Sequence, residues 1–479
     1  MLIAVFWLTV ICAGAWVWLF AGSRRIPREP FVELAHLRPG DFDPAERMAR
    51  LAVREAVVSG GGVWPAGAEA IEAGLERLAG SAESPGGMGS LGARIRERAL
   101  ELGAGEAPPL VAICVAARNE AVNLPECLLG LGTQAYGRLR VYVCDDQSDD
   151  GTWELLERVQ SKGQIGGLEA FRSEGLPAGW SGKNHALHLA AGRALAGGSE
   201  RPEYLLFVDA DVRLSFDAVH AAVEIAERED LDLLSVVPNQ ECGTLAEALM
   251  VPFLFHMLSL LFPSDRELSR PEGQYLACGQ FILIRTVAYE QVGGHAALAG
   301  VRVEDIALAT RVHKAGGRCL WGFTRILATT RMYRGWREVW RGLVKNAYEG
   351  MGSRPEKLVV GLLVAGYLAF WPWVSFALWN TWDLDEPGMG RDLVPVLVLG
   401  IAVISTVGLL ASAASIARMQ IICNARPVWL LAWTLPVSTL LYMVICIQSF
   451  VEHVFLGGPS WKGRRYGRRA SVKGVMEKG

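Results

Sequence analysis

Apolar and polar positions divide the chain of 479 residues into runs of very different character. Residues 2–21 carry no charge, and about 20 apolar residues suffice to cross a bilayer as a helix. Arg24 and Arg25 follow, so the positive-inside tendency places the next domain in the cytosol. A cleavable signal peptide is the alternative, but no Lys or Arg precedes this run and the run is too long. We predict an uncleaved N-terminal anchor over residues 1–22.

Three further apolar runs of spanning length lie at 358–379, 393–416 and 428–450. The first is rich in Trp near one end, which is typical of a lipid–water interface. A shorter apolar run, 246–262, suits either a buried core helix or a helix on the membrane surface. We therefore predict C-terminal membrane segments within 351–456.

The charges around these runs do not agree on one topology. Arg24 and Arg25 follow the first span, so their place in the cytosol would put the N-terminus outside. Four spans would then put the C-terminus outside as well, yet the basic tail at 457–479 also favours the cytosol. Either one segment is re-entrant or the tail departs from the charge rule. Pro436 makes the last run a candidate for a broken hairpin.

The polar part of the chain has two sections. Residues 23–108 are charged, rich in Gly and Ala and weakly patterned, which predicts a linker with surface helices. From Leu110 onward, strand and helix patterns alternate, so residues 109–350 read as one α/β domain with a mostly parallel sheet and ligands at its carboxyl edge. The predicted strands are 110–117, 139–144, 204–210, 231–238 and 280–286. The predicted helices are 123–134, 152–162, 184–196 and 305–316.

Composition narrows the function. The formal net charge is only −3, and the polar part has no basic, aromatic-interleaved stripe, so nucleic acid is not expected as a partner. Nine cysteines are scattered without a CxxC pair, which predicts neither a zinc site nor a disulfide framework. Reduced thiols behave as small apolar side chains and suit a cytosolic face.

Acidic pairs stand on or beside predicted strand ends. Uncompensated carboxylates grouped there would repel one another, but a divalent cation with a polar ligand makes them tolerable. A nucleotide-sugar site fits, because a metal ion neutralises the diphosphate while a carboxylate activates an acceptor hydroxyl. The pattern points to a glycosyltransferase. The pairs are Asp145 and Asp146, Asp209 and Asp211, and Glu304 and Asp305.

Two of these pairs differ in how specific they are. Asp209 and Asp211 are two residues apart, so on an extended backbone both would face one side and hold a divalent cation with its diphosphate. Such a tripeptide also occurs by chance in many proteins, but its position directly after the apolar segment YLLFV makes it a more specific signal of a metal site. Asp145 could bind a nucleobase or ribose, or could instead form a local Asx-turn or helix cap. Asp149 or Asp150 suits that local role.

Three further features have both a local and a chemical interpretation. Lys183 in GWSGKN could face phosphate together with a helix N-terminus, although a plain N-cap at Ser181 explains the segment equally well. Glu304 and Asp305 open a helix, where the helix dipole favours acids in any case. Arg341 lies in a segment with two Trp residues on one face, typical of a helix along a membrane surface, and could also supply a cation to a leaving diphosphate.

Taken in order, several motifs resemble those of family 2 glycosyltransferases with a GT-A fold, most of all the hopene-associated glycosyltransferases, membrane proteins linked to hopanoid biosynthesis. The resemblance is strong over residues 110–350. In place of the Q-x-x-R-W signature of processive synthases stands RGWREVWRG, which favours transfer of a single sugar. The motifs are VAARNEA, DDQSDDGT, GWSGKN, DAD, CGQFILIR, GGH, VEDIALATRV and RMYRGWREVWRG.

The resemblance implies roles for particular residues. Glu120 and Asp145 would lie at the nucleoside pocket. Lys183, Asp209 and Arg341 are further candidate contacts of the nucleotide-sugar because of the chemistry of their own side chains. Asp211, helped by Asp209, would bind Mg²⁺ or Mn²⁺. Asp305 would be the catalytic base, and Glu304 could orient it. In this family the donor is usually a uridine diphosphate sugar, and the anomeric centre is inverted.

We therefore expect an integral protein of the bacterial inner or cell membrane, with its catalytic domain in the cytoplasm, that glycosylates a lipid, plausibly a hopanoid. The alternative acceptors are a carotenoid, a sphingolipid-like lipid or a polyprenyl phosphate. A transporter or an inactive scaffold that keeps the fold is the rival from another class. The three C-terminal runs contain no Asp, Glu, Lys, Arg or His, which argues against transport. The sequence names no protein partner.

Overall fold

The computed structural model describes residues 2–23, 107–134, 136–197, 200–261, 275–351, 353–379, 393–423, 425–431 and 433–456, with residues 458, 460–461 and 464–465 near the C-terminus. Nearly all of the predicted linker and of the basic tail lies outside these residues. The described chain forms two compact units, an α/β unit and a helical unit.

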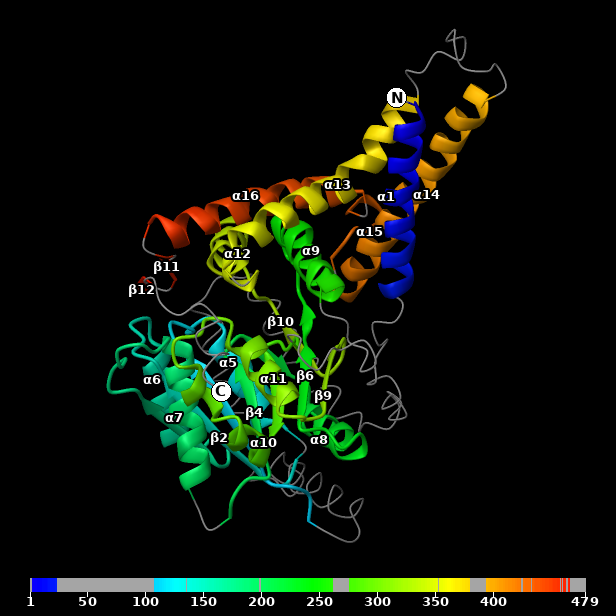
Figure 1. Cartoon of the computed structure of the whole chain (residues 1–479). Coiled ribbons are helices and arrows are strands. Elements are labelled where there is room, and N and C mark those ends of the chain that lie inside the picture. Colours follow the sequence, from blue (N-terminus) through cyan, green and yellow to red (C-terminus); the bar gives the residue numbers. More distant parts are fainter. Residues whose placement is uncertain are drawn as a thin grey trace. The chain divides into compact units, whose positions relative to one another are not determined.

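The α/β unit contains a seven-stranded sheet in the order β3-β2-β1-β4-β8-β6-β9 (Figure 1). Six of these strands run in one direction, and β8 lies antiparallel between β4 and β6. The strands are β1 (Val111–Ala117), β2 (Leu139–Asp145), β3 (Leu168–Arg172), β4 (Tyr204–Asp209), β6 (Leu233–Val237), β8 (Phe281–Arg285) and β9 (Cys319–Phe323).

Helices and short strands complete this unit. The helices are α5 (Leu124–Gly132), α6 (Thr152–Ser161), α7 (Gly182–Ala196), α8 (Ala218–Arg228), α10 (Thr286–Gln291), the 3₁₀ helix η3 (Gly294–Leu298) and α11 (Glu304–Lys314). A small three-stranded sheet has the order β5 (Val212–Leu214), β10 (Ala328–Thr330) and β7 (Asn239–Gln240). The chain passes into the helical unit at β7.

The sheet is built from strands that are apolar along their length. Val111, Ile113 and Val115 are fully buried, as parallel strands covered on both faces require. All five predicted strands and all four predicted helices are present. The sequence patterns did not predict β3, β9 or α8. The expected α/β fold with a mostly parallel mixed sheet is confirmed.

The helical unit gathers segments that are distant in sequence. In Figure 1 the blue helix α1 runs beside the orange helix α14, and these two helices pack along each other. Its elements are α1 (Leu2–Ser23), α9 (Leu245–Leu261), α12 (Trp336–Gly350), α13 (Pro355–Trp379), α14 (Leu393–Ile422), α15 (Val428–Leu431), α16 (Leu435–Val454) and the short strands β11 (Ser460–Trp461) and β12 (Arg464–Arg465). Helices α9 and α12 lie within the predicted 109–350 domain but pack in this unit.

Three helices of this unit are long and apolar enough to cross a membrane: Pro355–Ala377, Val398–Ile421 and Leu435–Val454. They match the predicted C-terminal runs with one difference. The run 428–450 is divided, because α15 ends at Leu431 and α16 begins at Leu435. Pro436 stands in the first turn of α16, where its missing N–H costs nothing, so the interruption of the run lies directly before this proline.

The apolar run at 246–262 forms a buried core helix, which is one of the two structures that the sequence predicts for it. Phe253 and His256 of α9 are almost fully buried, and the His256 ring stacks on Trp16 of α1 at a centroid distance of 6.2 Å. Trp16 in turn donates a hydrogen bond of 2.7 Å to the backbone oxygen of Leu368 in α13. These contacts hold α1 within the helical unit, and its role as a membrane anchor stays a prediction.

Candidate active site

The sheet register places two of the acid pairs on either side of one strand. Near the carboxyl end of β1, Ala116 is the partner of Asp209 on β4, and Ala117 is the partner of Asp145 on β2. Because β8 is antiparallel, its first residue Phe281 pairs with Val208, so the segment before β8 reaches the same edge. Strands from three parts of the chain therefore deliver polar groups to one edge of the sheet, where α/β folds bind their ligands.

Lys183 joins two of the acidic pairs. Its ammonium nitrogen lies 2.7 Å from Oδ1 of Asp209 and 2.7 Å from Oε1 of Glu304. Burial alone lowers the pKa of an ammonium group, but the two carboxylates raise the pKa of Lys183 well above its usual value. The lysine is therefore a fixed positive charge between the end of β4 and the start of α11.

Asp305 is held by backbone groups. Its Oδ2 accepts a hydrogen bond of 2.9 Å from the backbone N–H of Gly279, and its Oδ1 accepts one of 2.8 Å from Ile306. Burial raises the pKa of Asp305 to about 6, and the neighbouring charge of Glu304 adds to the shift, while Lys183 opposes it. A carboxylate of this pKa can accept a proton near neutral pH.

Gly279 has no side chain for a steric reason. A Cβ atom built there would lie 2.9 Å from Nζ of Lys183, 3.4 Å from Oδ2 of Asp305 and 3.5 Å from Oε1 of Glu304. The first distance is shorter than any normal contact, so a side chain would push the ammonium out of place. Gly279 thus lets three charged groups approach one backbone position.

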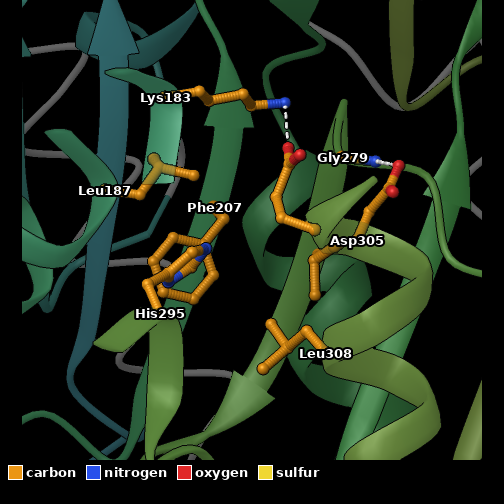
Figure 2. Close-up of a pocket in the computed structure, with 9 residues that line it drawn as sticks. Lys183, Leu187, Phe207, Gly279, His295, Asp305 and Leu308 are labelled. Atoms are coloured by element: carbon orange, nitrogen blue, oxygen red, sulfur yellow. Dashed lines mark hydrogen bonds and ion pairs between the residues drawn. The ribbon is translucent and has the colours of Figure 1, made fainter. Parts of the chain in front are cut away.

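These groups line one side of a pocket whose other side is apolar (Figure 2). The ring of Phe207 lies 4.6 Å from that of His295, nearly perpendicular to it. Burial lowers the pKa of His295 to about 3, so its imidazole is neutral at physiological pH. Leu187 and Leu308 complete this wall. An apolar wall beside fixed charges lowers the local dielectric constant and strengthens the electrostatic interactions among these charges.

A second set of hydrogen bonds joins α7 to the segment before α11. The amide nitrogen of Asn184, which is fully buried, donates to the backbone oxygens of Leu298 and Val301, the latter at 2.8 Å. The backbone N–H of Ser181 donates to the oxygen of Ala299 at 2.7 Å. The contacts explain how Lys183 on α7 reaches Glu304, because they fix the two segments next to each other.

The local interpretation of Ser181 is also confirmed, since its hydroxyl accepts a hydrogen bond from the backbone of Asn184 and caps α7. Both interpretations of GWSGKN therefore hold together. Ser181 caps the helix, and Lys183 in the first turn of that helix brings a positive charge to the acidic residues.

The remaining acids near β2 take part in turn structure. Asp145 is fully buried, and its Oδ2 pairs with Nε of Arg172 at 2.9 Å and also accepts from the backbone of Ser148. Asp150 accepts from the backbone and hydroxyl of Thr152, which confirms the local role expected of it. The Oε2 atom of Glu120 accepts a hydrogen bond of 2.9 Å from Asn123. The nucleoside contacts of Asp145 and Glu120 stay predictions.

The expected geometry of Asp209 and Asp211 requires a correction. Strand β4 ends at Asp209, and Asp211 lies in the turn before β5, so an extended backbone does not place the two side chains on one face. The oxygens of both carboxylates are nevertheless the hard ligands that Mg²⁺ and Mn²⁺ accept. Within the described ranges, no group of three or more His, Cys, Asp or Glu side chains is arranged to hold a metal ion. Phosphate oxygens would have to complete such a site.

Arg341 belongs to the helical unit, on α12, where its side chain is exposed. The rings of Trp336 and Trp340 lie 5.1 Å apart, as expected for residues four apart on one helix face. Trp340 donates a hydrogen bond of 2.8 Å to Gln448 of α16, so the amphipathic helix is fixed to a candidate span. The contact of Arg341 with a diphosphate stays a prediction.

Sequence reasoning missed Gly279, Asn184 and His295 as site residues. Each lies inside a motif that was noted for other reasons: CGQFILIR, GWSGKN and GGH. A glycine directly before a predicted strand was the available signal for Gly279, because it marks a close approach of backbone to other groups. No sequence signal identified the partners of Asn184, which lie more than a hundred residues away.

The chain is similar to known proteins. Residues 112–293 match the family model described as Glycosyl transferase family 2. A 4,4'-diaponeurosporenoate glycosyltransferase of Staphylococcus haemolyticus is 25% identical over 268 residues, which cover 54% of this chain and 67% of that protein.

Solved structures with similarity include the mannosyltransferase PcManGT from Pyrobaculum calidifontis in complex with GDP-Man and Mn²⁺, with a TM-score of 0.39, 17% identity and coverage of 81% of this chain and 99% of that one. TarS 1–349 of S. aureus in complex with UDP-GlcNAc has a TM-score of 0.35, 15% identity and coverage of 71% and 90%. The family match runs from β1 to the turn after α10, so it includes Asp145, Asp209 and Asp211 and ends before Glu304 and Asp305. Residues 112–293 therefore form a glycosyltransferase family 2 domain, and the protein is a glycosyltransferase.

Proposed function

We propose that the protein is an inverting, metal-dependent enzyme that transfers a single sugar from a nucleotide-sugar, a uridine diphosphate sugar, to a lipid acceptor. The observation that carries this proposal is the arrangement of Asp305. It is a carboxylate with a raised pKa, fixed by two backbone N–H groups, beside a lysine that bridges two further acids. Acid–base chemistry and charge neutralisation thus meet in one pocket.

The assignment of Asp305 as the base follows from the roles that suit the other acids. An inverting displacement needs one carboxylate on the acceptor side of the anomeric carbon, to remove the proton of the attacking hydroxyl. Asp209 and Asp211 are suited to bind the divalent cation, and Asp145 and Glu120 are suited to contact the nucleoside. Asp305 is then the base. Glu304, which contacts Lys183 at 2.7 Å, fixes the charges around it.

The donor's diphosphate would meet two positive groups. A divalent cation at Asp209 and Asp211 would bind its oxygens and stabilise the charge that develops on departure, as one or two carboxylates with phosphate oxygens commonly hold Mg²⁺. Lys183 supplies a further cation from the N-terminal turn of α7. We also keep Arg341 as a donor contact, since a guanidinium suits phosphate geometry.

A lipid acceptor agrees with the membrane character of the chain. In the part of the chain that the structure describes, three helices are long and apolar enough to cross a bilayer, which suggests membrane association. We propose that the catalytic domain faces the cytoplasm, where nucleotide-sugars are made. The motifs resemble those of hopene-associated enzymes and favour a hopanoid.

A carotenoid is the second candidate acceptor. The relative from Staphylococcus haemolyticus is a 4,4'-diaponeurosporenoate glycosyltransferase, and the match covers two thirds of that protein. A sphingolipid-like lipid and a polyprenyl phosphate are further alternatives within the same reaction class.

Comparative mass spectrometry of total lipids decides among these acceptors. Cells with and without the gene are extracted and compared, and an Asp305→Asn strain serves as the matched inactive control. We expect a lipid that carries an added hexose or N-acetylhexosamine in the wild type only. Its unglycosylated mass identifies a hopanoid or a carotenoid. Identical lipid profiles in all three strains would contradict the lipid acceptor.

A further inference from the structure

The carboxylate proposed as a metal ligand already has a cation beside it. Oδ1 of Asp209 lies 2.7 Å from the ammonium nitrogen of Lys183, a distance typical of a charge-assisted hydrogen bond. The same nitrogen lies 2.7 Å from Glu304, so a single positive charge neutralises the end of β4 and the start of α11 together. Figure 2 shows the lysine extended toward the acidic side of the pocket.

The position of this ammonium is built into the fold. Ser181 caps the helix that carries Lys183, and Asn184 ties the first turn of that helix to the segment before α11. Gly279 leaves the space that the ammonium occupies, because a Cβ atom there would lie 2.9 Å from it. Three independent features therefore direct one lysine to the metal-binding carboxylate.

An ammonium and a divalent cation cannot share Asp209 without strong repulsion. Two cations about 4 Å apart at the edge of a protein repel by several kcal/mol when no anion lies between them. The diphosphate of a donor supplies such an anion. Its oxygens can accept the ammonium of Lys183 while they also complete the coordination of the metal ion.

We propose that Lys183 is the internal counter-ion of the metal site. In the enzyme without donor it occupies Asp209, and on donor binding it exchanges Asp209 for the diphosphate while Glu304 keeps it nearby. The divalent cation consequently binds together with the nucleotide and not before it. This inference rests on the proposed function, because it takes Asp209 as a ligand of the cation.

The proposal assigns effects of opposite sign to one side chain. Lys183→Met keeps much of the length of the side chain and removes its charge. We expect this variant to bind Mn²⁺ alone at least about tenfold more tightly than the wild type, since the competing cation is gone. It should bind uridine diphosphate in the presence of Mn²⁺ more weakly, since a phosphate contact is lost. A residue with only a structural role would weaken both.

The experiment is titration of Mn²⁺ into the full chain in detergent, with free Mn²⁺ followed by electron paramagnetic resonance, without and with uridine diphosphate. Lys183→Arg retains the charge and should bind Mn²⁺ alone as weakly as the wild type. The double variant Lys183→Met with Asp209→Asn should lose the tightening, which locates the effect at Asp209. The wild type should bind Mn²⁺ at least about tenfold more tightly once the nucleotide is present.

Two results would overturn the proposal. One is wild-type affinity for Mn²⁺ that is the same with and without the nucleotide, a test that needs no variant. The other is a folded Lys183→Met protein whose affinity for Mn²⁺ alone is unchanged or reduced. Neither measurement depends on sugar transfer, so an enzyme that shows the exchange but glycosylates no lipid would contradict the proposed function and leave this inference standing.

Discussion

The backbone N–H of Gly279 donates a hydrogen bond of 2.9 Å to Oδ2 of Asp305. This contact joins the segment that enters β8 to the first turn of α11 and fixes the carboxylate that we propose as the base. Because the donor is a backbone N–H, no substitution other than one to proline removes it. The geometry of the base can therefore be tested through the space around Gly279 as well as through Asp305 itself.

Asp305→Asn should lower the turnover of sugar transfer by about 100- to 10,000-fold, the range typical of removing a general base. The amide oxygen can still accept from Gly279 or Ile306, so donor and metal binding should stay nearly normal. Transfer to a membrane lipid extract and calorimetry with the donor on the same protein check both statements. Near wild-type transfer would remove Asp305 from the role.

The rate should depend on pH through Asp305, whose pKa lies near 6. The base must be ionised, so turnover should be constant above this pH and fall about tenfold per pH unit below it. The sign for stability is opposite to that of an ordinary aspartate. Because the folded form binds the proton more tightly than the unfolded form, stability falls as pH rises from about 4 to about 6. A pH profile without this acidic limb would contradict the assignment.

Gly279→Ala should reduce turnover by at least about tenfold, because the added Cβ would meet Lys183 at 2.9 Å and displace the ammonium. Gly192→Ala is the matched control. It lies in α7, nothing lies within 4 Å of its added Cβ, and alanine favours a helix by up to about 1 kcal/mol. Transfer assays and thermal unfolding of both variants separate an effect on the site from an effect on the fold.

Asn184→Ala removes the hydrogen bonds to Leu298 and Val301 and should leave buried carbonyl groups unsatisfied. We expect a loss of about 1–3 kcal/mol in the free energy of unfolding. We also expect turnover to fall more than affinity for the donor, because Glu304 and Asp305 lose their fixed position relative to Lys183. Denaturant unfolding and steady-state kinetics measure the two effects. Unchanged turnover in a destabilised variant would limit Asn184 to a structural role.

A cytosolic catalytic domain predicts that a cysteine introduced at Ser59, between α1 and β1, is protected in intact cells from a membrane-impermeant maleimide. Labelling should appear once the cells are permeabilised, and the parent chain treated in the same way provides the background of its nine native cysteines. Labelling of intact cells would reverse the topology.

The sequence by itself determined the elements whose pattern is local. The order of side chains alone predicts two kinds of element. A strand buried on both faces must be apolar along its length, as β1 is from Val111 to Val115. A helix that crosses a bilayer must be apolar over about 20 residues. The acid pairs were visible in the same way. Their position after apolar strands was enough to predict one site at the carboxyl edge of the sheet.

The tertiary structure decided which groups meet at that site. The antiparallel insertion of β8 brings Gly279 to Asp305, and the hydrogen bonds of Asn184 bring Lys183 to Glu304. These contacts join residues that are 26 to 121 positions apart, and their register depends on strand pairing and packing that no local period encodes. The sequence therefore identified the acids and Lys183 as candidates, whereas the fold alone decided that Lys183 contacts Asp209 and Glu304 and that Gly279 lies against them.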